Sequence, residues 1–123
     1  MSALILVIDD DPLTRLTIAA LLEDAGYAVI AAENGEEGLE LVAKHRPQLV
    51  ITDMVMPRME GSEAIRAIKH DHAGVRILAI SGGGRIGNAD FITTALELGA
   101  DGALAKPFGF EELDAAVRRC LAG

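Results

Sequence analysis

The sequence predicts an α/β protein built on a parallel sheet of five strands. Five short apolar runs alternate along the chain with five stretches that have helical spacing. Strands that alternate with helices favour a parallel sheet with right-handed crossovers. The first run, Leu4 to Ile8, is continuously apolar, which is typical of a strand covered on both faces. The 123 residues fit one domain of ordinary size, so we expect a single domain over residues 1–123.

The first predicted helix runs from Pro12 to Ala25. Asp11 is a suitable N-cap, and proline is favoured at the first helical position. Gly26 provides the residue at which the helix ends. The apolar residues that share one face of this helix are Leu13, Leu16, Ala20 and Leu21.

The remaining elements follow the same alternation. Further strands are predicted at Ala28 to Ala32, Leu49 to Thr52, Arg76 to Ile80 and Gly102 to Ala105. Further helices are predicted at Gly35 to Lys44, about Ser62 to Lys69, Ala89 to Leu98 and Glu111 to Leu121. Asn34 can cap the second helix, whose Leu39 and Val42 should point inward. The last helix is acidic at its start and basic near its end, which suits the helix dipole.

Polar residues follow the predicted strands at the point where each strand ends. Asp9 and Asp10 follow the first strand, and Asp53 follows the third. Ser81 follows the fourth strand and Lys106 the fifth. Ligands of open α/β sheets bind beyond the carboxyl ends of the strands. If the first and third strands are neighbours, the three aspartates therefore converge in one pocket, which the serine and the lysine flank.

This set of side chains suits phosphoryl transfer. Three carboxylates in one pocket repel one another, and a hard cation such as Mg²⁺ relieves the repulsion. A lysine and a hydroxyl can contact phosphate oxygens. A carboxylate can itself be the nucleophile and form an aspartyl phosphate. Asp53 suits that role because it stands alone after its strand and faces the acidic pair.

Four motifs, in register with the strand ends, resemble the receiver domains of response regulators in two-component signal transduction. The resemblance covers the whole chain in order. It rests on the segments Val7–Asp10, Leu49–Pro57, Ile80–Gly82 and Gly102–Phe108. It implies a flavodoxin-like (βα)₅ fold, a doubly wound parallel sheet with strand order 2-1-3-4-5.

The resemblance also implies an acceptor and a metal site. Asp53 would accept the phosphoryl group from a phosphohistidine. Asp10 and Asp53 would bind Mg²⁺ or Mn²⁺ directly, together with the backbone carbonyl of Val55. Asp9 would bind the ion mainly through water.

The remaining implied roles concern the phosphoryl group. Lys106 would pair with Asp53 or with its phosphoryl group, and the Lys106–Pro107 bond would be cis. The Ser81 hydroxyl, with Gly82 beside it, would contact a phosphoryl oxygen.

The chain departs from the commonest receivers in how it could switch. Many receivers carry an aromatic residue three positions before the lysine, where this chain has Ala103. The loop after the fourth strand is longer than usual and contains Gly82, Gly83, Gly84 and Gly87. Because glycine resists ordering, we expect this loop to be mobile. We hypothesise that the loop supplies the conformational change that Ala103 cannot.

A second departure concerns loss of the phosphoryl group. Val55 lies two positions after the acceptor, and Gly83 lies two positions after the hydroxyl residue. Neither side chain can orient an attacking water molecule, so we predict slow autodephosphorylation.

The resemblance implies a sensor histidine kinase or a histidine phosphotransfer domain as partner. Contact would involve the first helix and the loops around Asp53, and output would pass through the fourth helix, fifth strand and fifth helix. The formal charge of −8 and the few aromatic residues argue against direct nucleic-acid binding. No apolar run approaches the roughly 20 residues that span a bilayer, so we expect no membrane insertion. A lone cysteine, Cys120, fits a cytoplasmic location, and an acidic module of this kind is expected to be monomeric.

The sequence disfavours three other functions. The segment Gly82–Gly87 matches a dinucleotide-binding GxGxxG pattern, but it follows the fourth strand rather than opening the first βαβ unit. A phosphohydrolase of the haloacid dehalogenase type would need an aspartate where Val55 stands. A pseudo-receiver that only docks partners is disfavoured by the complete set of site residues, although Ala103 leaves some room for it.

Overall fold

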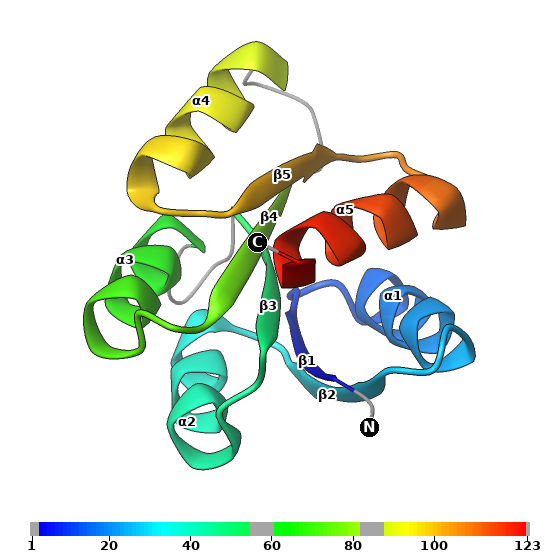
Figure 1. Cartoon of the computed structure of the whole chain (residues 1–123), viewed down its shortest axis with the longest axis horizontal. Coiled ribbons are helices and arrows are strands. Elements are labelled where there is room, and N and C mark those ends of the chain that lie inside the picture. Colours follow the sequence, from blue (N-terminus) through cyan, green and yellow to red (C-terminus); the bar gives the residue numbers. More distant parts are fainter. Residues whose placement is uncertain (1–2, 55–60, 82–87, 123) are drawn as a thin grey trace.

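Five strands alternate with five helices in the computed structural model, which describes residues 3–54, 61–81 and 88–122 (Figure 1). The strands are β1 (Leu4–Ile8), β2 (Ala28–Ala32), β3 (Leu49–Asp53), β4 (Arg76–Ser81) and β5 (Gly102–Ala105). The helices are α1 (Pro12–Asp24), α2 (Gly35–His45), α3 (Gly61–Asp71), α4 (Asn88–Leu98) and α5 (Phe110–Ala122). Every predicted element is confirmed, with ends that differ by at most two residues.

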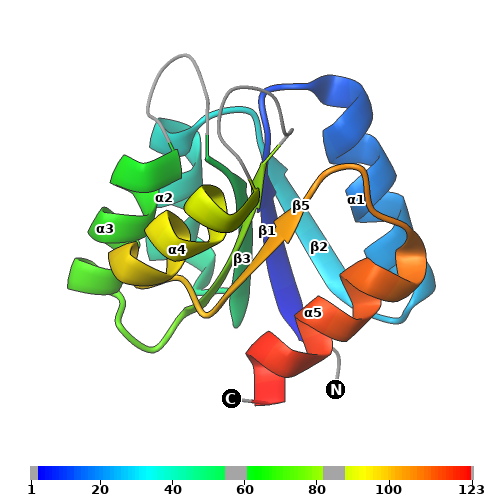
Figure 2. The same cartoon turned by 90° about the horizontal axis from the view of Figure 1, so that it is seen from above.

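The sheet is parallel throughout, and its strand order is β2-β1-β3-β4-β5, as the resemblance implied. Helices α2, α3 and α4 cover one face of the sheet, and α1 and α5 cover the other (Figure 2). The doubly wound, flavodoxin-like fold is therefore confirmed. Each pair of successive parallel strands is joined by a crossover that contains a helix, and in proteins such crossovers are almost always right-handed.

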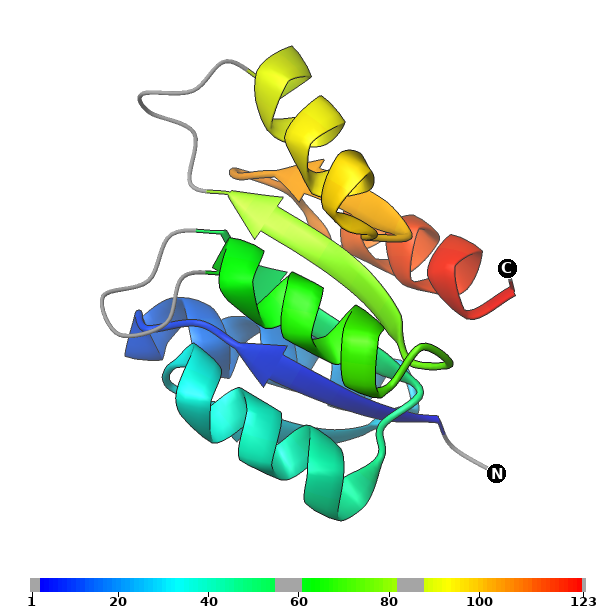
Figure 3. The same cartoon turned by 90° about the vertical axis from the view of Figure 1, so that its left-hand side faces the viewer.

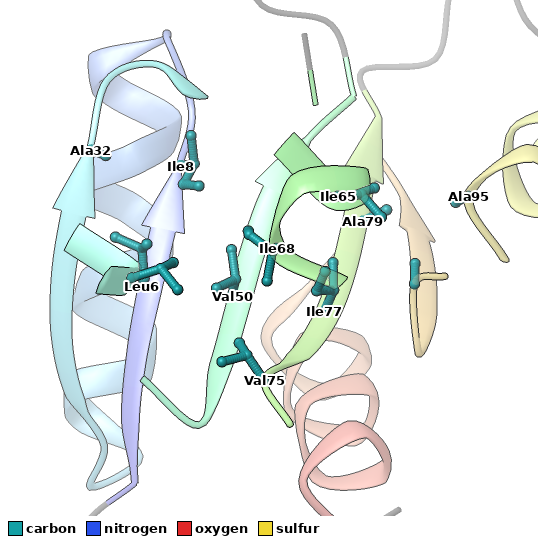
Figure 4. Packing of buried hydrophobic residues seen from close by; sticks show 12 residues of the cluster. Leu6, Ile8, Ala32, Val50, Ile65, Ile68, Val75, Ile77, Ala79 and Ala95 are labelled. Carbon is teal, nitrogen blue, oxygen red and sulfur yellow. The ribbon is translucent and has the colours of Figure 1, made fainter. Parts of the chain in front are cut away.

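Two apolar clusters, one on each face of the sheet, make up the core. Because alternate strand residues face opposite sides, neighbouring residues of a strand enter different clusters. Leu6 and Val50 pack under α2 and α3, with Ile65 and Ile68 of α3 above them (Figure 4). The opposite cluster contains strand residues together with Ile18 and Leu22 of α1 and Leu113 and Val117 of α5. Both clusters hold the strands rigidly, which fixes where the strand ends lie.

Of the four residues predicted to form the apolar face of α1, Leu21 is half-buried and packs against the core, but the other three do not. Leu13 and Leu16 are 74% and 66% exposed, and Ala20 is also exposed. The buried residues of the helix are Ile18 and Leu22, which lie four positions apart and so form one line along it. The reason is that α1 has apolar residues on more than one side, so spacing alone did not decide which side faces the core.

Two strands extend one residue further than predicted, and both extensions reach candidate site residues. Asp53 belongs to β3 and pairs in register with Ile80. Ser81 belongs to β4 and pairs with Ala105. The acceptor candidate and the hydroxyl candidate are thus held by the hydrogen-bonded sheet rather than by loops.

Candidate functional site

The candidate site lies at the carboxyl-terminal ends of β1, β3 and β5, the end of the sheet toward which the strands point (Figure 3). β1 and β3 are neighbours, so the residues that follow β1 come close to the end of β3. Carboxylate oxygens of Asp9, Asp10 and Asp53 lie within 4.8 Å of one another. The convergence that the sequence predicted is therefore present in the structure.

The three carboxylates differ in their exposure. Asp9 is fully buried and Asp53 is 7% exposed, whereas Asp10 is open to solvent. Burial of a charged group is costly unless a partner of opposite charge is close. A positively charged group must therefore lie close to the two buried aspartates.

Lys106 is that partner. Its Nζ donates a hydrogen bond to Oδ2 of Asp53 at 3.0 Å and another to Oδ2 of Asp9 at 3.1 Å. Burial alone would lower the pKa of Lys106, but the hydrogen bonds and charges of Asp53 and Asp9 outweigh it and raise the pKa above the ordinary value. The ammonium group thus stays charged and neutralises part of the acidic cluster.

The backbone around Lys106 holds the lysine in this position. Its N–H donates to the carbonyl oxygen of Ser81 at 2.7 Å, which joins the ends of β4 and β5. The Lys106–Pro107 bond is cis, as the resemblance implied. Because β4 lies between β3 and β5, only a long side chain on β5 can reach the end of β3.

Ser81 lies on β4, the strand next to that of Asp53, but the side chains of the two residues belong to opposite faces of the sheet. Asp53 is in register with Ile80, so Ser81 has the alternation of Ala79, whose side chain packs in the cluster beneath α3 and α4. Ala103 packs against the same cluster and is in register with Ala79. The predicted hydroxyl and the predicted switch position therefore belong to the same face of the sheet.

The other predicted site residues fall outside the described part of the chain. These residues are Val55, Gly82, Gly83, Gly84 and Gly87. Their predicted roles in metal binding, phosphate contact and switching stay predictions.

The donor set fits a hard divalent cation. Within the described residues, the one group of His, Cys, Asp and Glu side chains with metal-ligand spacing is Asp9, Asp10 and Asp53, and it offers only oxygen ligands. Mg²⁺ prefers oxygen ligands and is commonly bound by one or two carboxylates together with waters and phosphate oxygens. Soft metals favour sulfur or imidazole, which this group lacks.

Sequence reasoning missed three contacts that shape the site. It did not predict that Lys106 bonds to Asp9 as well as to Asp53. It also missed Arg15, whose Nη1 donates to the carbonyl oxygen of Asp9 at 2.7 Å, and buried Thr52, whose hydroxyl donates to the carbonyl oxygen of Asp53 at 3.0 Å. No motif marked these contacts, because each depends on how one side chain lies in the folded protein.

Two other polar features have structural explanations. Asp11 is the N-cap of α1 and accepts a hydrogen bond from the backbone N–H of Thr14, as predicted. Cys120 is buried, and burial and the negative charge of Asp101 raise the pKa of its thiol, so a reactive thiolate is disfavoured.

Comparisons with known proteins agree with this geometry. The family model of the response regulator receiver domain matches residues 5–118. The response regulator MprA of a Mycobacterium species (strain KMS) is 36% identical over 121 residues, which are 98% of this chain and 51% of the relative. The chain thus spans about half the length of the curated relatives it matches.

Solved structures show the same likeness. The chemotaxis protein CheY4 of Vibrio cholerae superposes with a TM-score of 0.89 at 31% identity, over 98% of this chain and 100% of that protein. NtrX of Brucella abortus superposes with a TM-score of 0.91 at 30% identity, over 99% of this chain and 27% of that protein. In the described residues, no helix has the length and apolar character needed to cross a membrane.

Proposed function

The chain belongs to the family of response regulator receiver domains, which act in two-component signalling, and we propose that Asp53 is the residue that accepts the phosphoryl group. The contact that supports this most is the 3.0 Å hydrogen bond from Lys106 to Asp53, beside two further carboxylates within ligand distance. A nucleophilic carboxylate, a cation and additional oxygen ligands are the groups that phosphoryl transfer requires.

We further propose that Asp9, Asp10 and Asp53 hold Mg²⁺ or Mn²⁺. A divalent ion there would offset the charge of the carboxylates and of the phosphoryl oxygens. An oxygen of Asp53 forms a bond to phosphorus while the bond between phosphorus and the donor imidazole breaks, and the imidazole leaves with the electron pair. Lys106 stays close to Asp53 throughout and can pass one of its hydrogen bonds to a phosphoryl oxygen.

The proposed donor is a sensor histidine kinase or a histidine phosphotransfer domain. Leu13, an exposed leucine of α1, lines a groove of about 320 Å³ between α1 and the Lys106–Phe108 segment, and Leu16 of the same helix is also exposed. Large exposed apolar residues next to a groove are typical of a protein interface. A helix that docks on this surface would bring its histidine toward the end of β3, where Asp53 lies.

The central test is the intact mass after incubation with acetyl phosphate. With Mg²⁺, the wild type is expected to gain one phosphoryl group, and the gain should disappear with EDTA or in Asp53→Asn. The matched control is Asp24→Asn, an exposed aspartate at the end of α1, which should be phosphorylated like the wild type. A gain that persists in Asp53→Asn would reject Asp53 as the acceptor. A wild type that no phosphodonor can phosphorylate would reject the function.

In the proposed function, the domain carries a signal and does not turn over an external substrate. We therefore expect the phosphoryl group on Asp53 to be lost slowly. Val55 and Gly83 lack polar side chains that could orient water, and we expect a phosphoprotein half-life far longer than seconds. Val55→Asn should dephosphorylate about tenfold faster, because its amide can orient water, whereas Val55→Ala should not. The decay of the phosphorylated mass after removal of acetyl phosphate measures this. Decay of the wild type within seconds would contradict the expectation.

A further inference from the structure

Arg15 makes an unusual contact for a residue in the first turns of a helix. It lies in α1, and its Nη1 donates a hydrogen bond of 2.7 Å to the backbone carbonyl oxygen of Asp9, the residue that follows β1. The side chain is half-buried, so the bond is partly shielded from water. A helix side chain is thus anchored to the turn that carries the acidic pair.

Asp9 is held at every polar position. Its N–H donates to the carbonyl oxygen of Ala32 at 3.2 Å, and its Oδ1 accepts from the N–H of Asp11 at 2.9 Å. Its Oδ2 accepts from Lys106, and its carbonyl oxygen accepts from Arg15. These hydrogen bonds hold both the backbone and the side chain of Asp9 in place.

The anchored carbonyl matters for the next residue. The carbonyl group of Asp9 and the N–H of Asp10 belong to one planar peptide unit, so fixing the carbonyl fixes the direction in which the chain enters Asp10. The Asp10 side chain is exposed, and within the described residues no hydrogen bond holds its carboxylate. The orientation of the peptide is then what keeps that carboxylate near Asp53.

We propose that Arg15 is a positioning residue that orients the Asp9–Asp10 peptide and so raises the affinity of the acidic cluster for a divalent cation. This inference rests on the proposed function, because it assumes that Asp9, Asp10 and Asp53 bind such a cation. Electrostatics alone would predict the opposite effect of Arg15 on the affinity for the cation. A positive charge near a cation site weakens cation binding, so loss of the guanidinium would then tighten it.

The test is the dissociation constant for Mg²⁺, measured by calorimetry, for the wild type, Arg15→Met and Arg15→Lys. We expect Arg15→Met to bind Mg²⁺ about tenfold more weakly, as is common when a group that orients metal ligands is removed. Arg15→Lys keeps the charge and a donor, so it should recover part of the affinity. In acetyl phosphate reactions, Arg15→Met should need about tenfold more Mg²⁺ for half-maximal rate but should approach the wild-type rate at saturation.

Two control variants separate this role from a purely structural one. Arg118→Met removes an equal charge at an exposed arginine of α5 that pairs with the half-buried Asp114, and Ile18→Val weakens the packing of α1. Both should bind Mg²⁺ like the wild type. Unchanged or tighter Mg²⁺ binding by Arg15→Met would overturn the inference and leave the proposed function intact. A wild type that binds no Mg²⁺ would overturn both.

Discussion

At the scale of single residues, the site separates three aspartates by what holds each one. Asp9 is buried and bonded at every polar atom, and Asp53 is tied to Lys106 at the end of β3. Asp10 is exposed, and within the described residues no hydrogen bond holds its carboxylate. Asp10 thus adds negative charge to the cluster, and it would stabilise the protein only when a cation binds.

Neutralising Asp10 should therefore separate stability from function. Without divalent ions, we expect Asp10→Asn to raise the free energy of unfolding by on the order of 1 kcal/mol, because it relieves repulsion and breaks no hydrogen bond with a described residue. Addition of Mg²⁺ should stabilise the wild type but not the variant. Urea unfolding with and without Mg²⁺ measures both effects. A variant less stable than the wild type without Mg²⁺ would contradict this reading.

Lys106 and Arg15 mark the limit of residue-level prediction. The sequence placed Lys106 at the end of the fifth strand, and its pairing with Asp53 followed from the resemblance. Its second bond, to Asp9 after β1, requires the side chain to reach past the ends of both β4 and β3, which strand order alone does not specify. The Arg15 contact depends on how α1 is rotated about its axis, and that rotation was predicted wrongly.

At the scale of elements, α1 shows why spacing can mislead. A helix with apolar residues on several sides offers more than one face that could pack on the sheet. Ile18 and Leu22 occupy the core side, which leaves Leu13 and Leu16 exposed. Leu13 lines the groove that contains Lys106, and Leu16 is exposed on the same helix, so the failure of the packing prediction points toward a functional role for this surface.

That docking role predicts a selective loss of activity. We expect the double variant Leu13→Gln and Leu16→Gln to receive phosphoryl groups at least tenfold more slowly from a phosphorylated histidine phosphotransfer domain that phosphorylates the wild type. The rate with acetyl phosphate should not change, because that donor needs no docking surface. Leu96→Gln on α4, a leucine that is 49% exposed, is the control and should behave as the wild type. Equal slowing with both donors would mean that the leucines act on the chemistry instead.

Asp101 stabilises the β5 edge of the sheet, because it links α3, β4 and the start of β5. Its Oδ2 accepts from Lys69 of α3 at 2.9 Å and from the N–H of Ile77 in β4 at 2.8 Å, and Asp101 directly precedes β5. Burial alone would raise the pKa of Asp101, but these bonds and the nearby cations lower it below its ordinary value. The ionised form therefore contributes stability above pH 3.8, and this contribution is lost as the pH falls through the lower pKa of the folded state.

Asp101→Asn should accordingly lower the free energy of unfolding by on the order of 1 kcal/mol at neutral pH, because Asp101 is open to solvent, which screens its ion pairs. Below the pKa of Asp101 in the folded state, the difference between the variant and the wild type should shrink, because the wild type has then lost the ionised carboxylate as well. Urea unfolding between pH 7 and pH 3 tests this. A difference that does not decrease toward low pH would exclude the ionised carboxylate as the source of stability.

At the scale of the whole molecule, the alternation of strands and helices was enough to predict the parallel sheet. The resemblance then supplied the strand order, which local patterns do not contain. Convergence of Asp9, Asp10 and Asp53 follows once β1 and β3 are neighbours, because parallel strands present their carboxyl ends on the same edge. The side-chain contacts within the site could not be predicted, because they depend on packing on both faces of the sheet.

The role of Asp53 as the acceptor is best tested by locating the acyl phosphate in the chain. The wild type would be phosphorylated with acetyl phosphate and Mg²⁺, reduced with borohydride, which converts an aspartyl phosphate to homoserine, and mapped by peptide mass spectrometry. We expect homoserine at position 53 and nowhere else. Homoserine at position 9 or 10, or a phosphorylated protein that yields no homoserine, would contradict it.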